Sequence, residues 1–258
     1  MTGAPPLKVY WQPGCTSCLR AKEFLAANGV PFESINVRAD AGAFAELERL
    51  GVRTVPVVSR GDDYVLAQDI DELARFVGLE SRRERLAPDE LAARLQSLLG
   101  AAETLVAALP PDRLHDKLPQ RERSWLDLGF HVSMIVQGLV TAATGGELTY
   151  EMYERRAPAS WRDAAPAVDF SRATRRALAS WWREARQDAG LRVKTYFGET
   201  SLESLLERSA WHVAQHCRQL DYLVHEVAGV NEAPRLPADA LAGLPVPVAV
   251  WDAEIVPV

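Results

Sequence analysis

The 258-residue chain contains few cysteines and no long apolar run. Three cysteines are too few to cross-link a secreted fold of this size, and their number fits a reducing cytosol. No uninterrupted apolar stretch approaches the roughly 18 residues that suggest a membrane span. The first residues, Met-Thr-Gly-Ala-Pro-Pro, lack the basic and apolar regions of a signal peptide. We therefore expect a cytoplasmic protein without a membrane partner.

The chain also lacks an excess of positive charge. Its net charge is −6, and no run of lysine and arginine is long enough to create a nucleic-acid surface. It has no internal repeat. With 48% hydrophobic and 25% charged residues, the composition is that of a globular protein, and the length suits one large domain or two ordinary ones.

Two of the three cysteines form a Cys-x-x-Cys motif, Cys15-Thr16-Ser17-Cys18. It follows a short apolar run and a Pro-Gly turn, and a helix is predicted from residue 19 to residue 29. Unpaired N–H groups and the positive end of the helix dipole favour a thiolate, so we expect Cys15 to have a lowered pKa and to be the nucleophile. Cys18, one turn later, is expected to resolve a mixed disulfide. Half of a zinc site is the alternative, but zinc needs four ligands and Cys217 is the only other cysteine.

The segment around this motif alternates between strand and helix patterns. After a strand at residues 8–11 and the first helix, we predict a strand at 31–37, a helix at 41–50, strands at 55–58 and 64–66, and a helix at 69–77. This βαβαββα order resembles glutaredoxin and the glutaredoxin-like electron donors of the thioredoxin superfamily, over about residues 7 to 79. The second motif of that resemblance is Thr54-Val55-Pro56, which implies a cis proline.

The same resemblance implies a site for a low-molecular-weight thiol. The family's lysine three residues before the first cysteine is Gln12 here, and its Gly-Gly pair is Gln68-Asp69. In the family, the lysine and the Gly-Gly pair hold the charged ends of glutathione, and both are replaced here. The sequence therefore does not decide between glutathione, mycothiol and bacillithiol as the thiol. The expected thiol-substrate residues are Gln12, Thr54, Val55, Pro56, Gln68 and Asp69.

The rest of the chain predicts a second, all-α domain. We expect a glutaredoxin-like domain at residues 1–80, a charged linker at 81–87, a four-helix bundle at 88–230 and an extended proline-rich tail at 231–258. The four helices are predicted at 88–109, 124–144, 171–188 and 200–227. Trp251 is the expected anchor of the tail.

Three histidines fall on the apolar faces of two of these helices. His212 and His216 are an i,i+4 pair on the last helix, and His131 lies on the second. A buried imidazole must satisfy two nitrogens, and a metal ion satisfies one on each ring. We therefore expect one divalent metal, zinc or nickel, with water at an open position. The other possible ligands are expected elsewhere: Cys217 in the core, and His115 and His225 at the surface.

This layout resembles the DinB/YfiT-like family over about residues 86 to 230. The resemblance implies a His131, His212 and His216 metal triad and a thiol S-transferase activity. Our leading hypothesis is a metal-dependent two-domain enzyme that couples thiol–disulfide exchange to transfer of a small thiol. Its partners would be that thiol, the disulfide or electrophile of that thiol, and a thiol reductase. The alternatives are a plain oxidoreductase whose bundle docks partners or oligomerises, and a non-enzymatic metal-binding redox sensor.

Overall fold

The computed structural model describes residues 5–81, 83–119, 121–184 and 190–253. Its contacts divide the chain into two compact units. The thioredoxin-like unit runs to Glu84 and includes the segment from Pro247 onward, and the helical unit is Arg85–Val246. Arg82, in the expected linker, and the last five residues of the expected tail lie outside the described residues.

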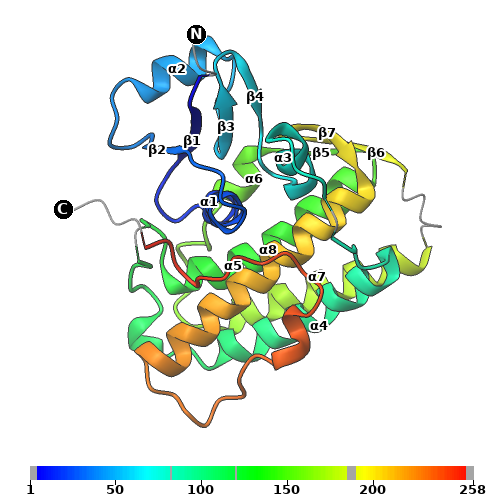
Figure 1. Ribbon diagram of the computed structural model, residues 1–258. Coiled ribbons are helices and arrows are strands. Elements are labelled where there is room, and N and C mark those ends of the chain that lie inside the picture. The colour runs from blue at the N-terminus through cyan, green and yellow to red at the C-terminus, as the bar shows by residue number, and fades with distance from the viewer. Residues whose placement is uncertain (1–4, 82, 120, 185–189, 254–258) are drawn as a thin grey trace. The chain divides into compact units, whose positions relative to one another are not determined.

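The thioredoxin-like unit has the predicted order of elements: β1 (Leu7–Trp11), α1 (Thr16–Ala27), β2 (Glu33–Asn36), α2 (Ala43–Arg49), β3 (Val57–Arg60), β4 (Asp63–Val65) and α3 (Ile70–Phe76). The strands form one sheet in the order β2-β1-β3-β4 (Figure 1). Strand β1 is parallel to β2 and antiparallel to β3, which pairs with β4 across a tight turn at Gly61. This is the α/β thioredoxin-like arrangement expected from the sequence.

Alternation along β1 gives this sheet two covered faces. Val9 packs in a core cluster with side chains of α1 and α3, whereas Tyr10 packs in a second cluster with side chains of α2. Helices therefore cover the sheet on both sides, which is why β1 and β3 are almost entirely buried. The end of β1 carries the chain directly into the Cys-x-x-Cys turn.

The segment after Pro247 belongs to the thioredoxin-like unit and is fastened to α1. Glu23 accepts hydrogen bonds from the backbone N–H groups of residues 248 and 249, at 2.5 and 2.9 Å. Lys22 forms a buried ion pair of 2.7 Å with Asp252. The expected anchor, Trp251, is only half-buried. Paired polar groups on α1 therefore hold this segment.

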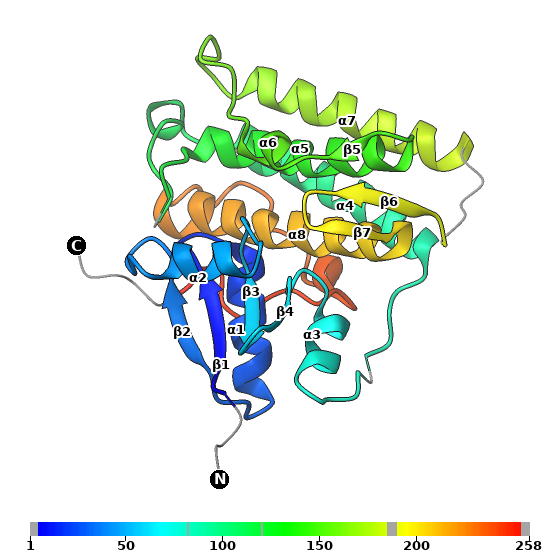
Figure 2. The same cartoon turned by 90° about the horizontal axis from the view of Figure 1, so that it is seen from above.

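The helical unit contains four long helices: α4 (Pro88–Ala107), α5 (Trp125–Ala143), α7 (Ala165–Glu184) and α8 (Leu202–Tyr222). Both α4 and α5 pack against α7 and α8 (Figure 2). Helix α5 begins with a capping box, in which Ser124 and Asp127 each accept a hydrogen bond from the other's backbone N–H. Among the described helices, α5 alone is long and apolar enough to cross a membrane, but 78% of that window is buried inside the protein, as in a core helix.

Two features of the helical unit differ from the expectation. Helix α7 begins at Ala165, not at Ser171, because Pro166 lies in the first turn, where no N–H partner is lost. Its predicted end at Asp188 lies outside the described residues. The connection between the second and third long helices contains β5 (Glu147–Leu148) and a short helix, α6 (Tyr150–Glu154). Strand β5 joins β6 (Arg192–Thr195) and β7 (Gly198–Ser201) in a small sheet that contacts α5 and α8.

Two glycines of the helical unit differ in how closely other side chains approach them, and we predict opposite effects on stability when each is replaced by alanine. A Cβ at Gly129 of α5 would lie 2.6 Å from Val106 Cγ2, and a β-branched side chain in a helix cannot easily rotate away. We expect Gly129→Ala to lower the free energy of unfolding by about 1–3 kcal/mol. At Gly100 of α4 the nearest atom would be 3.9 Å away, so Gly100→Ala should raise it by about 0.5–1 kcal/mol. Urea unfolding of both variants checks this, and two changes of the same sign would contradict it.

Candidate functional sites

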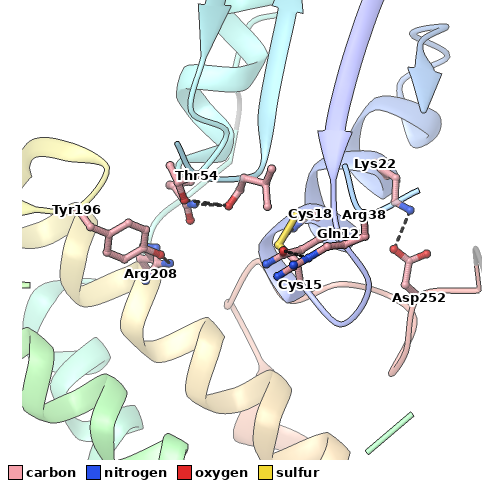
Figure 3. The surroundings of a disulfide bond; sticks show 11 residues. Gln12, Cys15, Cys18, Lys22, Arg38, Thr54, Tyr196, Arg208 and Asp252 are labelled. Carbon is pink, nitrogen blue, oxygen red and sulfur yellow. Dashed lines mark hydrogen bonds and ion pairs between the residues drawn. A yellow bond between two sulfur atoms is a disulfide. The ribbon is translucent and has the colours of Figure 1, made fainter. Parts of the chain in front are cut away.

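The first candidate site is the disulfide between Cys15 and Cys18, whose Cα atoms lie 5.2 Å apart. Cys15 is the N-cap residue of α1, and its Sγ accepts a hydrogen bond of 3.2 Å from the Cys18 N–H (Figure 3). Cys15 is half-buried, whereas Cys18 is fully buried. A sulfur at a helix N-terminus that accepts a backbone N–H is placed to carry negative charge. Exposure and position therefore both favour Cys15 as the sulfur that meets a substrate.

The predicted thiol-substrate residues lie on three segments of the same unit. Gln12 follows β1, and its Oε1 accepts a hydrogen bond of 3.3 Å from Arg38, a residue that the sequence reasoning missed. Thr54, Val55 and Pro56 precede β3, and the Val55–Pro56 peptide bond is cis, which confirms that expectation.

Gln68 and Asp69 lie where α3 begins. The Gln68 side chain donates a hydrogen bond of 3.4 Å to the Val55 carbonyl, so these two predicted residues are brought together. Buried Arg20 holds this loop by donating to the Gln68 carbonyl at 2.7 Å. Asp69 is the N-cap of α3 and accepts from the Asp71 N–H at 2.8 Å. Asp69 therefore has a clear structural task, and its role toward a thiol remains a proposal.

The second candidate site is a buried cluster of histidines in the helical unit. His131 comes from α5, and His212 and His216 lie one turn apart on α8. One ring nitrogen of each lies within 4.8 Å of those of the other two. The ring centroids of His131 are 5.6 Å from His212 and 5.2 Å from His216. The three side chains thus converge as the helical periodicity predicted.

The hydrogen bonds of the cluster fit a metal. His216 Nδ1 lies 2.7 Å from Gln219 Oε1, so Nδ1–H donates and Nε2 is left with a lone pair. That Nε2 lies 3.1 Å from His212 Nε2. The Nδ1 atoms of His131 and His212 are buried and have no hydrogen-bond partner among the described residues. Such orphaned nitrogens are costly in a protein interior, so two of the three rings lack the hydrogen bonds that a purely structural histidine would make.

Burial keeps the three imidazoles neutral, which is the form that ligates metals. It lowers the pKa of His131 and of His212 well below the usual value, and the pKa of His216 to about 3. The charges of Arg123 and Arg208 act in the same direction on the pKa of His131.

These lowered pKa values predict a loss of stability in acid. Below about pH 6.5 the unfolded chain binds protons that the folded cluster does not, so stability falls as pH falls. For each imidazole, the free energy of unfolding falls by about 1.4 kcal/mol for every pH unit below about 6.5. For His216 this fall continues down to its folded pKa of about 3. We expect His216→Gln to reduce the slope of unfolding free energy against pH by that amount in the metal-free full chain. Urea unfolding at pH 7, 6 and 5 measures it, and an unchanged slope would show that His216 does not titrate as described.

Around the histidines lie polar residues that the sequence reasoning missed. The ring of Tyr153, from α6, meets His131 and His212 edge-on, with centroids 5.4 and 5.8 Å apart. Its hydroxyl accepts from Arg208 at 3.3 Å, and Arg208 also donates to Tyr196 Oη at 2.9 Å. Arg208 precedes His212 by four residues and so lies on the same helix face. A charged residue on that apolar face was the sequence signal that could have indicated a polar site there.

The remaining expectations have mixed outcomes. Cys217 is packed core as predicted: burial raises the pKa of its thiol to about 12. His115 is exposed, also as predicted. The prediction for His225 was wrong, because that residue is buried with its ring nitrogens 2.9 and 3.0 Å from the carbonyl oxygens of Asp221 and Ala233. A π-helical turn at Leu223–Val227 follows α8, and its wider turn shifts the face that a 3.6-residue period assigns.

Comparison with known proteins identifies the thioredoxin-like unit. Residues 7–65 match the glutaredoxin family model. The chain is 39% identical over 54 residues to the Gene 56 protein of Mycobacterium phage L5, a match that covers 20% of this chain and 52% of that protein. The chain thus spans about half the length of this curated relative.

Two human structures were also matched. The apo form of glutathione-S-transferase T1-1 is 15% identical, with a TM-score of 0.33 over 92% of this chain and 96% of that one. A tryptophan-to-arginine mutant of the same protein, also in the apo form, is 16% identical, with a TM-score of 0.32 over 92% and 99%. TM-scores this low do not establish that the helical unit shares the fold of these structures. Residues 7–65 form a glutaredoxin-like thiol oxidoreductase domain of the thioredoxin superfamily.

Proposed function

We propose that this chain is a metal-dependent thiol-handling enzyme, in which the disulfide site exchanges thiols and disulfides and the helical unit transfers a small thiol. The proposal of metal-dependent thiol transfer by the helical unit rests on three buried imidazoles that converge, with one nitrogen of each within 4.8 Å of the others. The glutaredoxin-like domain supports the proposal of thiol–disulfide exchange.

Thiol–disulfide exchange follows from the placement of the two cysteines. The Cys15 thiolate attacks one sulfur of a small disulfide, forms a mixed disulfide and releases the other half as a thiolate. Cys18, after losing its proton, attacks Cys15 Sγ and releases the second thiolate. The product is the Cys15–Cys18 disulfide seen in the structure. An external dithiol or a thiol reductase supplies the two electrons that restore the reduced pair.

In the helical unit, we propose that His131, His212 and His216 hold one zinc or nickel ion, in a DinB-like four-helix bundle formed by α4, α5, α7 and α8. A divalent ion there would lower the pKa of a bound thiol and polarise an electrophile. The chain's own residues set the conditions. Gln219 orients His216, and the burial of all three rings limits access of water.

The small thiol is the shared substrate of the proposal. Glutathione, mycothiol and bacillithiol remain candidates, and the residues proposed to hold the thiol on the disulfide side are Gln12, Thr54, Val55, Pro56, Gln68 and Asp69. Such a thiol and a reductase to regenerate it fit a reducing compartment such as the cytoplasm. Covalent linkage of two sites raises their effective concentration to the millimolar range. The chain passes between the units twice, near residues 84 and 246, because the thioredoxin-like unit is made of two segments and the helical unit is the continuous segment between them.

Complementation between two full-length variants tests the proposal. The substrates are the disulfide of a small thiol, a dithiol reductant whose uncatalysed reaction is subtracted, and an alkylating electrophile; the product measured is the thioether. Cys15→Ser and His212→Ala should each lose this sequential reaction. At micromolar protein, far below the effective concentration, a 1:1 mixture should recover only a small part of the wild-type rate.

Two outcomes would count against the proposal. If the mixture reaches half the wild-type rate per chain, linkage gives no advantage. If His212→Ala retains full thioether formation, the helical unit does not catalyse transfer, and the chain is a plain oxidoreductase.

A further inference from the structure

Two buried arginines lie beside the histidine cluster and share one neighbour, Tyr153. Arg208 donates to the Tyr153 hydroxyl. Arg123, which immediately precedes the N-cap of α5, donates through Nη2 to the Tyr153 backbone carbonyl. The exposed fractions of the two residues are 4% and 5%. The Tyr153 ring meets His131 and His212, so its hydroxyl brings Arg208 to the cluster, and Arg123 is close enough for its charge to act on His131.

Arg123 has an unused donor. Its Nη1 is buried and has no hydrogen-bond partner among the described residues. The Nη2 atom of Arg123 lies 3.5 Å from a carboxylate oxygen of Glu154. The Glu154 side chain is 53% exposed, so this ion pair is weak. Asp127 is already engaged by the N–H groups of Ser124 and Ala157 and by Arg156. A buried guanidinium N–H without an acceptor is costly, and an anion bound there would satisfy it.

The charge balance around the histidines leads to the same conclusion. Four groups act electrostatically on His131: the three arginines Arg123, Arg121 and Arg208, and the neighbouring His216. Burial, followed by the charge of Arg123, lowers the pKa of Arg121 to about 10. A divalent ion on three neutral imidazoles would add two more positive charges, so the site calls for an anion from outside the chain.

We infer that the helical unit binds a small thiol that carries a carboxylate, with the carboxylate held by Arg123 and the sulfur directed to the histidines. The inference rests on the proposed metal centre and names the substrate class of that site. Arg123 offers planar N–H donors that match a carboxylate, and a charge-assisted bond in a buried site is among the stronger polar contacts. Arg208, braced by two tyrosine hydroxyls, adds a fixed positive charge beside it.

Two isosteric probes test the inference: 3-mercaptopropionate and its amide, 3-mercaptopropionamide. The full chain is loaded with cobalt(II), and each thiol is titrated while the thiolate-to-cobalt charge-transfer absorption is recorded. We expect the carboxylate probe to bind at least about tenfold more tightly than the amide. Arg123→Gln should reduce this ratio to about one and leave the affinity for the amide within about twofold. Arg172→Gln, on the exposed side of α7, removes the same charge and should keep the tenfold ratio.

Each outcome has a distinct meaning. If cobalt binds and the two thiols coordinate with equal affinity to the wild-type chain, the inference is overturned and the metal centre stands. That comparison needs no variant, so it holds even if Arg123→Gln unfolds. A preference that persists in a folded Arg123→Gln variant removes Arg123 from the site. If no cobalt binds, the metal centre and the inference fail together.

Discussion

Replacing Cys15 by serine is expected to abolish disulfide reduction, with a loss in kcat/KM on the order of 10³-fold or more. The hydroxyl of serine ionises far less readily than a thiol, and the N-terminus of α1 would no longer face a thiolate. Cys18→Ser should behave differently, because the first attack by Cys15 remains possible while resolution does not. That variant should accumulate a mixed disulfide with the small thiol, visible by mass spectrometry of the intact chain.

The third cysteine provides the control. Cys217 is buried and its thiol contacts the Leu98 carbonyl in the core of the helical unit, so Cys217→Ala should keep full reductase activity. If Cys15→Ser traps the mixed disulfide instead of Cys18→Ser, the roles of the two cysteines are reversed. If both variants keep their activity, the disulfide is structural.

Loss of one histidine of the cluster is expected to reduce metal affinity by at least two orders of magnitude. In His212→Ala only two imidazoles remain, which is too few for a tight site of this type. Gln219→Leu should cost about 10–100-fold, because it removes the hydrogen bond that fixes the tautomer of His216. Competition with a chromophoric chelator measures zinc and nickel affinities in the full chain.

Here the matched control is His115→Ala, which removes an exposed histidine of the same unit and should leave the affinity unchanged. Far-UV circular dichroism must show that each variant is folded, since the cluster lies in the core. Equal metal affinities in the wild type, His212→Ala and Gln219→Leu would show that the metal does not bind at these histidines.

The thioredoxin-like unit could be predicted well because its signals are local. A Pro-Gly turn, a Cys-x-x-Cys at a helix start and a Thr-Val-Pro before a strand each specify structure within a few residues. The errors there are small shifts of bounds: α1 begins at Thr16, and β3 at Val57. Both follow from caps and turns that hydrophobic periodicity does not register.

The helical unit was predicted where a helix is long and misread where the chain is irregular. Regular periodicity placed His131, His212 and His216 on inward faces, and the structure brings them together. Arg123 and Tyr153 were missed because one lies in a turn and the other in a five-residue helix, where no period exists to indicate a face.

The most direct test of the account is X-ray absorption at the zinc edge of the zinc-loaded full chain, with and without a small thiol. The account predicts three imidazole nitrogens at about 2.0–2.1 Å with one oxygen ligand, and replacement of that oxygen by a sulfur at about 2.3 Å when the thiol is added. A first shell of oxygen ligands only, or a spectrum that the thiol does not change, would contradict the claim that these histidines hold a metal that takes up a thiol.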